Sequence, residues 1–255
     1  MTKLTHFSLF SGIGGIDLAG DWAGFETVGQ VEMAEYPYQV LCKHWPDVPK
    51  WRDVREVTRE SVQEKGIGKI TVLSGGFPCQ PFSVAGKRKG TDDDRHLWPE
   101  MFRVIKELRP SWVVGENVSG IVSMELDSVI SDLKSEQYEV RVFMIPACGV
   151  GALHQRYRIF IIAHDERDSM KHNYDGVVPT IDASGVSDDW MVWTGEYFSE
   201  GVWKSEPPIG RVATGIPKRV DRLKCLGNAV VPQQIYPLLK TIATIEQMGD
   251  NNTTG

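Results

Sequence analysis

The sequence predicts an α/β fold, an open parallel sheet covered by helices on both faces, and three observations support this prediction. Short apolar runs alternate with helical patterns through most of the 255 residues, as they do in parallel strands joined by crossover helices. The first apolar run leads directly into a glycine turn, Gly12-Ile-Gly-Gly15, which in a doubly wound sheet lies beside the ligand crevice. A hydrophobic content of 41% with 24% charged residues is ordinary for a globular chain that buries a core.

Each expected strand is a short apolar run, and the helices occupy the mixed patterns between these runs. The runs predict strands at Thr5–Phe10, Thr27–Val31, Ile70–Leu73, Trp112–Gly115, Val140–Ile145 and Ile159–Ala163. The mixed patterns predict helices at Gly15–Trp22, Tyr36–His44, Leu97–Leu108, Ser123–Leu133 and Gln233–Gln247.

The alternation ends after His164, and we expect the chain to divide there. Residues 165–205 carry nine Asp/Glu against three Lys/Arg, with no clear period. The stretch 206–224 is basic instead, and its cations are Arg211, Lys218, Arg219, Arg222 and Lys224. The expected parts are therefore an α/β domain over 1–164, a small irregular region over 165–222 and a C-terminal segment over 223–255.

Composition argues against several classes of protein. No stretch approaches the roughly 18 apolar residues of a membrane span, and the first residues lack the pattern of a signal peptide. We therefore expect a cytoplasmic protein with no membrane partner. The cysteines, Cys42, Cys79, Cys148 and Cys225, form no CxxC pair, so neither a metal site nor a disulfide framework is expected. The net charge of −6 requires any nucleic-acid contact to come from local basic patches.

One segment presents a cysteine in a tight turn. Residues 75–83 read Gly-Gly-Phe-Pro-Cys-Gln-Pro-Phe-Ser and follow an apolar run. Pro78 fixes its backbone angle and has no N–H, while Gly75 and Gly76 permit a sharp turn close to a bound molecule. The turn suits a presented thiol better than an inert one, so Cys79 is a candidate nucleophile.

Two acidic residues near strand ends indicate a nucleoside pocket. Glu32 follows the second expected strand, and Asp53 stands in Trp-Arg-Asp-Val. One carboxylate there can accept hydrogen bonds from ribose hydroxyls, and another can meet the exocyclic amine of adenine.

These features occur together in one known family, because the chain resembles the DNA cytosine-5 methyltransferases, which use S-adenosylmethionine. Five motifs carry the resemblance, in the family's order and over nearly the whole chain. They are Phe10-x-Gly-x-Gly-Gly15, Pro78-Cys79-Gln80, Glu116-Asn117-Val118, Arg156-Tyr157-Arg158 and Gly227-Asn228-Ala229-Val230. The resemblance implies a Rossmann-like methyltransferase sheet, with residues 165–222 as the target-recognition region and the C-terminal segment returning beside the first strand.

The resemblance also implies catalytic roles. Cys79 stands at the family's nucleophile position and would add to carbon 6 of cytosine, while Glu116 would bind the ring at N3. Asn117 is expected to brace the turn rather than act on the substrate. Arg156 and Arg158, two apart at the start of a strand, are expected to share a face and to bracket the flipped nucleotide. His154 stands where the family more often has Gln.

For the cofactor, the resemblance implies three groups of residues. The methionine part would lie against Phe10, Gly12, Ile13 and Gly14, the ribose against Glu32, and the adenine near Asp53, Val54 and Met33. Met33 falls where the family usually has a large apolar or aromatic residue. The lining would be completed by Pro78, Leu97, Asn228 and Val230.

The implied partner is double-stranded DNA with the target base flipped out of the helix. The loop after the nucleophile would touch the DNA backbone through Ser83, Lys87, Arg88 and Lys89. In the basic stretch, the expected DNA contacts are Arg211, Lys218, Arg219 and Arg222. We expect a monomer, of prokaryotic or phage type, which in a restriction–modification system would share its site with a restriction endonuclease.

Three alternatives follow from the same residues. The same chemistry can act on RNA, because some family members methylate transfer RNA. A catalytically silent DNA-binding relative is disfavoured by intact Cys79, Glu116 and Arg158. A Rossmann-type oxidoreductase is disfavoured by the missing GxGxxG pattern and leaves the Pro-Cys-Gln turn unexplained.

Overall fold

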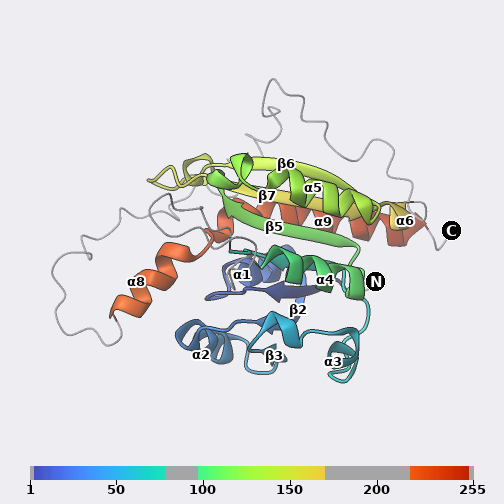
Figure 1. Cartoon of the computed structure of the whole chain (residues 1–255), viewed down its shortest axis with the longest axis horizontal. Coiled ribbons are helices and arrows are strands. Elements are labelled where there is room, and N and C mark those ends of the chain that lie inside the picture. Colours follow the sequence, from blue (N-terminus) through green and yellow to red (C-terminus); the bar gives the residue numbers. More distant parts are fainter. Residues whose placement is uncertain (1–2, 79–96, 170–218, 253–255) are drawn as a thin grey trace.

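A seven-stranded sheet in the order β3-β2-β1-β4-β5-β7-β6 forms the centre of the computed structural model, which describes residues 3–78, 97–169 and 219–252 (Figure 1). The strands are β1 (Thr5–Leu9), β2 (Glu26–Val31), β3 (Lys50–Trp51), β4 (Val72–Gly75), β5 (Trp112–Val118), β6 (Tyr138–Ile145) and β7 (Arg158–Asp165). The helices are α1 (Gly15–Ala23), α2 (Glu35–His44), α3 (Arg59–Gln63), α4 (Trp98–Leu108), α5 (Leu126–Ser135), α6 (Glu166–Ser169), α8 (Arg219–Asn228) and α9 (Pro232–Asn252). Three 3-10 turns are η1 (Val54–Glu56), η2 (Ser119–Ser123) and η3 (Ala147–Val150).

The sheet is parallel from β3 to β5 and antiparallel beyond β5. β1 pairs in parallel with β2 and β4, and β4 with β5, whereas β7 runs antiparallel to both β5 and β6. The expectation of an all-parallel sheet is therefore wrong at this edge. The connection from β6 to β7 contains η3 and no crossover helix, and a chain that reverses directly can pair only antiparallel.

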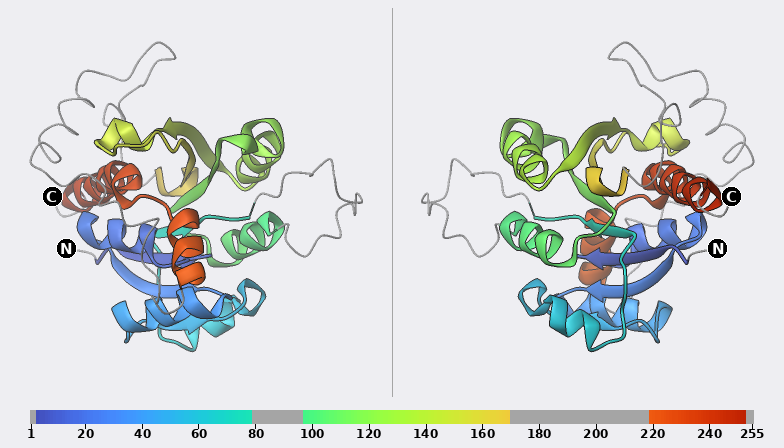
Figure 2. Two further views of the ribbon diagram at one scale, coloured as in Figure 1. Left: turned by 90° about the vertical axis from the view of Figure 1, so that its left-hand side faces the viewer. Right: turned by 90° about the vertical axis from the view of Figure 1, so that its right-hand side faces the viewer.

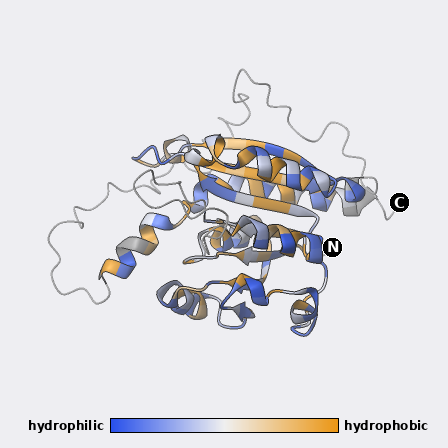
Figure 3. Ribbon diagram, in the orientation of Figure 1, coloured by the Kyte–Doolittle hydropathy of each residue, from blue (hydrophilic) through white to orange (hydrophobic). Residues whose placement is uncertain are grey.

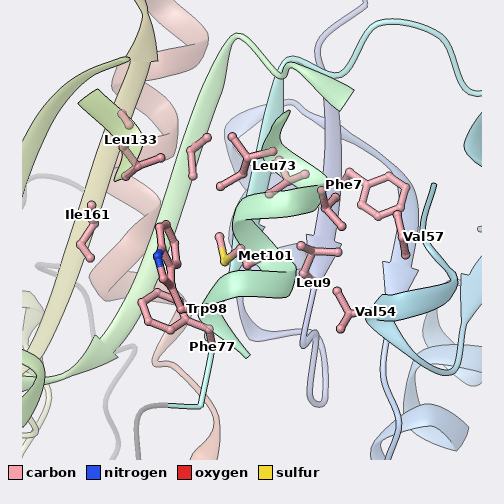
Figure 4. Packing of buried hydrophobic residues seen from close by; sticks show 14 of the residues in the cluster. Phe7, Leu9, Val54, Val57, Leu73, Phe77, Trp98, Met101, Leu133 and Ile161 are labelled. Atoms are coloured by element: carbon pink, nitrogen blue, oxygen red, sulfur yellow. The ribbon is translucent and has the colours of Figure 1, made fainter. Parts of the chain in front are cut away.

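Helices cover both faces of the sheet, which confirms the expected fold class. Figure 2 shows α1 and α9 on one face and α4 and α5 on the opposite face. On the first face, apolar side chains of α1 and α9 pack with Val72, Val114 and Phe160 of the sheet. On the second, Met101, Ile105 and other residues of α4 and α5 pack with Phe7, Leu73 and Ile161 (Figure 4).

The expected elements all form, with ends that shift by a few residues, and four further elements appear. β5 runs on to Val118, so Glu116 lies within the strand rather than after it. The elements missed were β3, α3, α6 and α8. β3 has two residues and α3 has five, too few for a period to show. In α8, hydrophobic and hydrophilic residues alternate along the helix, and four of the ten residues are charged (Figure 3).

The C-terminal helix α9 packs against the first helix, which places the segment before it next to the glycine turn. Trp22 of α1 and Tyr236 of α9 meet edge to face, with ring centroids 6.2 Å apart. The indole of Trp112 in β5 donates a hydrogen bond to Glu246 at 2.8 Å. Within the described ranges, no helix has the length and apolar character to span a bilayer.

Candidate functional site

A cavity of about 690 Å³ opens where β1, β2, β4 and β5 end. Its wall contains most of the residues predicted for a cofactor, namely Phe10, Gly12, Ile13, Glu32, Met33, Val54, Pro78, Leu97, Asn228 and Val230. Glu116 also lines it. Because these residues come from both ends of the sequence, the fold itself assembles the cavity at the carboxyl edge of the parallel strands.

The glycine turn after β1 forms one side of this cavity and has an unusual backbone. Phe10 has a φ of +52°, which is rare for a bulky residue, and Gly12 has +57°. Gly14, at +86°, caps the start of α1, and a Cβ on it would lie 2.5 Å from the Trp45 ring. A Cβ on Gly15 would lie 2.9 Å from Val230. The turn therefore needs glycine for its conformation and for its close contacts. Gly14 itself lines a neighbouring cavity of about 750 Å³ rather than the first.

Glu32 is fixed by two backbone amides. One carboxylate oxygen accepts a hydrogen bond from the Gly12 N–H at 2.8 Å, and the other accepts one from the Ala34 N–H at 2.7 Å. Each oxygen retains a lone pair, so the carboxylate is oriented and can still accept a hydrogen bond from a hydroxyl in the cavity. This geometry agrees with the predicted ribose contact.

Asp53 caps η1 rather than lining the cavity. Its carboxylate accepts a hydrogen bond from the Arg55 N–H at 3.0 Å, and Val54 provides the wall at this point. The preceding residue, Arg52, does line the cavity and was not predicted. Its guanidinium donates to the Met33 carbonyl at 2.7 Å and pairs with Glu35 at 2.8 Å. It also lies 4.2 Å from the centre of the Tyr38 ring.

Glu116, which lines the cavity, forms a buried ion pair with Arg158. Arg158 Nε lies 2.8 Å from Glu116 Oε1, and each side chain is 12% exposed. The antiparallel register brings them together, because Val118 of β5 is opposite Arg158 of β7. Burial raises the pKa of Glu116, against the opposing attraction of Arg158 and Arg156. A carboxyl group in this position can share its proton with a base that binds next to it.

The strand end that leads to Cys79 is held by Asn117. The Asn117 amide donates to the Phe77 carbonyl at 3.0 Å, and its oxygen accepts from the Val118 N–H at 2.9 Å. The expectation that Asn117 braces this turn is confirmed. A Cβ on Gly76 would lie 2.9 Å from Glu116, so glycine lets the chain pass the buried carboxyl group. Pro78 is the last residue described before Cys79.

Several of the predicted catalytic and DNA-binding residues lie outside the part of the chain that the structure describes. They are Cys79, Ser83, Lys87, Arg88, Lys89, Arg211 and Lys218. Arg219 begins α8, and Arg222 is an exposed residue of the same helix.

Arg156 lies just before β7, in an unusual conformation. Its φ is +28°, and β7 begins only at Arg158. The two-residue period of a strand therefore does not relate the two arginines, and the argument that they share a strand face is wrong. Arg156 Nη2 donates hydrogen bonds to the carbonyls of Gly227 at 2.6 Å and Ala229 at 2.7 Å. His154 lines the neighbouring cavity, together with Arg156.

Two cavity residues on α8 were missed by the sequence reading. Asp221 and Cys225 line the first cavity, and they are one helical turn apart. The spacing could have indicated a shared face, but the charged sequence of α8 gave no reason to expect a helix.

Comparison with known proteins agrees with this geometry. Residues 4–191 match the family model for C-5 cytosine-specific DNA methylase. The chain is 30% identical over 172 residues to the Type II methyltransferase M.HgiCII of Herpetosiphon aurantiacus, covering 66% of this chain and 38% of that protein. It is 33% identical over 174 residues to the Type II methyltransferase M.AquIA of Picosynechococcus sp., covering 62% of this chain and 70% of that protein.

A solved structure shows the same likeness. A protein encoded within an E. coli prophage, described as a DNA modification methyltransferase, aligns with a TM-score of 0.58 and 26% identity, covering 70% of this chain and 51% of that chain. The chain thus spans 38% of M.HgiCII and about half of the prophage protein.

Proposed function

The chain belongs to the family of C-5 cytosine-specific DNA methylases, and we propose that it methylates carbon 5 of cytosine in duplex DNA with S-adenosylmethionine as the methyl donor. The observation that carries the proposal is the buried Glu116–Arg158 pair. Glu116 lines the cavity, and β4, the strand next to β5, leads to Pro78 and Cys79.

The cavity fits this cofactor in size and in chemistry. A volume of about 690 Å³ is within the usual range for a cofactor of this size. Glu32, held by two amides, is oriented to accept hydrogen bonds from ribose hydroxyls, and Phe10, Met33, Val54, Leu97 and Val230 offer apolar surface. When bound, S-adenosylmethionine supplies an electrophilic methyl group. We assign Asp53 a supporting role, since it caps η1 next to Val54.

The chain's own residues activate the cytosine. Carbon 5 is a poor nucleophile, so we propose that the Cys79 thiolate first forms a bond to carbon 6. Electron density then moves onto the ring, and N3 takes a proton from Glu116, which Arg158 holds in place. After methylation, carbon 5 loses its proton to a base and the carbon–sulfur bond breaks. The thiolate returns, Glu116 recovers its proton from N3 and the ring is aromatic again.

The target base must leave the DNA helix to reach a carboxyl group that is this deeply buried. We propose that Ser83, Lys87, Arg88 and Lys89 hold the DNA backbone, together with Arg211, Lys218, Arg219 and Arg222. The acidic residues of 165–205 oppose phosphate binding, so the contacts are assigned to the basic stretch of the target-recognition region. Four further expectations stay predictions: the three-part division of the chain, the cytoplasmic location, the monomeric state and a partner endonuclease.

The test is bisulfite sequencing of a plasmid recovered from cells that express the protein, beside a Cys79→Ser control. We expect protected cytosines in one repeated sequence context, absent from the control. The context would also reveal the recognition sequence. Protection that persists in Cys79→Ser would rule out the covalent mechanism. Absence of protection with the wild type would contradict methylation of DNA by this chain alone, and a parallel assay on transfer RNA would test the alternative substrate.

A further inference from the structure

Two side chains fasten the segment Gly227–Gln234, here called the return segment, to the end of the β6–β7 hairpin. Arg156 donates both hydrogen bonds described above, to the Gly227 and Ala229 carbonyls, from one guanidinium nitrogen. In the opposite direction, Gln234 Nε2 donates to the carbonyls of Ile145 at 2.8 Å and of Arg156 at 3.0 Å. Arg156 therefore takes part through its side chain and through its backbone.

The backbone of Arg156 has a conformation that its surroundings must support. A φ of +28° is strained for a residue with a side chain, and such a conformation persists only where the surroundings determine it. Gln234 is fully buried, and of its two hydrogen bonds the one to the Ile145 carbonyl is buried and the one to the Arg156 carbonyl is partly buried. The strained residue is thus held from both sides.

The hydrogen bonds of Arg156 and Gln234, here called the clamp, connect the wall of the cofactor cavity with the Glu116–Arg158 pair. Asn228, Ala229 and Val230 of the return segment line the cofactor cavity. Two residues beyond Arg156, Arg158 pairs with Glu116, which lines the same cavity. A shift of the return segment would therefore displace Arg156, and with it Arg158 at the start of β7.

We propose that Arg156 is a positioning residue, which couples the cofactor cavity to the Glu116–Arg158 pair, rather than a residue that contacts the target nucleotide. The inference rests on the proposed function and deepens it. Both hydrogens of Arg156 Nη2 point at backbone carbonyls, so this nitrogen is already engaged within the protein. Since coupling is reciprocal, a filled cavity holds the return segment in place and thereby fixes Arg156 and the start of β7.

The experiment compares four variants of the full chain: Arg156→Met, Arg156→Lys, Arg158→Met and Arg141→Met. Arg141 is the matched control, because it is an exposed arginine of β6 that pairs only with Glu139 among the described residues. Calorimetry measures the Kd for S-adenosylmethionine, and steady-state kinetics separates the KM for the cofactor from the KM for DNA and from kcat. Amide hydrogen exchange of residues 227–234, without cofactor, reports on the clamp directly.

We expect Arg156→Met to raise the cofactor Kd and KM by about tenfold or more and to accelerate exchange in the return segment. Arg156→Lys keeps the charge and one flexible donor group, so it should recover part of both effects. Arg158→Met should lower kcat while the cofactor Kd changes by less than about threefold. Arg141→Met should match the wild type in every measurement.

The proposal would be overturned if Arg156→Met kept the wild-type cofactor Kd and exchange rates but lost kcat or affinity for DNA. Arg156 would then act on the nucleotide. If Arg156→Met does not fold, Arg156→Lys decides the question by the same two measurements. Failure of the wild type to bind S-adenosylmethionine would contradict the proposed function instead. The clamp would still be tested, because amide exchange is measured without cofactor.

Discussion

The proton of Glu116 is controlled by two opposing influences within a few ångströms. Burial favours the neutral acid and raises its pKa, while Arg158 and then Arg156 favour the carboxylate. Such a balance leaves the group able to give a proton to a ring nitrogen and to recover it. An exposed glutamate would remain ionised at neutral pH, and a buried one without arginines would hold its proton too tightly.

The substitution Glu116→Gln tests this role. Glutamine keeps the shape and can still donate to N3, but it has no acidic proton, so we expect kcat to fall by about 10²–10⁴. The cofactor Kd should stay within about threefold, since the ribose contact proposed for Glu32 is unchanged. Transfer of a labelled methyl group and calorimetry measure the two quantities. Glu139→Gln, at an exposed position of β6, is the control; equal activity of Glu116→Gln and this control would contradict the assignment.

At the level of single residues, sequence reasoning predicted which residues line the cavity better than it predicted the contacts between them. Phe10 and Glu116 were predicted from their motifs and Glu32 from its place after an expected strand, and all three line the cavity. Arg52 was missed, because its contacts with Met33, Glu35 and Tyr38 depend on how the residues after β3 meet the start of α2. Nothing local to a sequence encodes that meeting.

Among the elements, the close contact between α1 and the return segment decides whether the cavity has a complete wall. The alternation of apolar runs predicted α1 and α9 themselves. It could not predict the direction of β7, because an apolar run is the same in a parallel and an antiparallel strand. Nor did it predict α8, in which four of the ten residues are charged. The Glu116–Arg158 pair depends on that antiparallel register, so its geometry was beyond the sequence.

The substitution Gly15→Ala tests the contact between these elements. The added Cβ would lie 2.9 Å from both the side chain and the carbonyl of Val230, so the return segment must move away. We expect a loss of about 1–3 kcal/mol in the free energy of unfolding and a cofactor Kd raised by about tenfold. Chemical denaturation and calorimetry measure these changes.

A second glycine provides the control for that experiment. Gly68 has open space around its Cβ position, and we expect Gly68→Ala to leave both quantities unchanged or to stabilise the chain by a few tenths of a kcal/mol, about the range for compatible sites. If Gly15→Ala behaved like Gly68→Ala, the return segment would not be packed tightly against the glycine turn.

For the molecule as a whole, two buried ionisable groups beneath the cavity act oppositely on stability. Burial lowers the pKa of His6 to about 4, although Asp21 opposes the shift. Burial also raises the pKa of Asp17 to about 6, against hydrogen bonds from Gln30 and Ser8. Both are fully buried on either side of the interface between β1 and α1, and Ser8 also lines the cavity. The hydrogen bond from Ser8 to Asp17 therefore links one of these two groups to the cavity wall.

The signs follow from proton linkage. His6 binds its proton more weakly in the folded chain than in the unfolded chain. Its effect is therefore to lower the free energy of unfolding as the pH falls from 6.5 towards 4. Asp17 binds its proton more tightly in the folded chain. Its effect is therefore to raise the free energy of unfolding as the pH falls from 6 towards 3.8. Between pH 4 and 6 the two slopes are opposite and each is about 1.4 kcal/mol per pH unit, so they largely cancel in the wild type.

Single substitutions should remove this cancellation. In Asp17→Asn the slope from His6 remains, and the free energy of unfolding should fall by about 1.4 kcal/mol more per unit of acidification between pH 6 and 4 than in the wild type. In His6→Gln the slope from Asp17 remains, and acidification over the same range should stabilise the chain relative to the wild type. Urea denaturation at several pH values measures both slopes. The slope, not the absolute stability, is diagnostic, because either substitution also disturbs a buried hydrogen bond. Identical slopes in the wild type and both variants would show that neither group changes its proton affinity on folding.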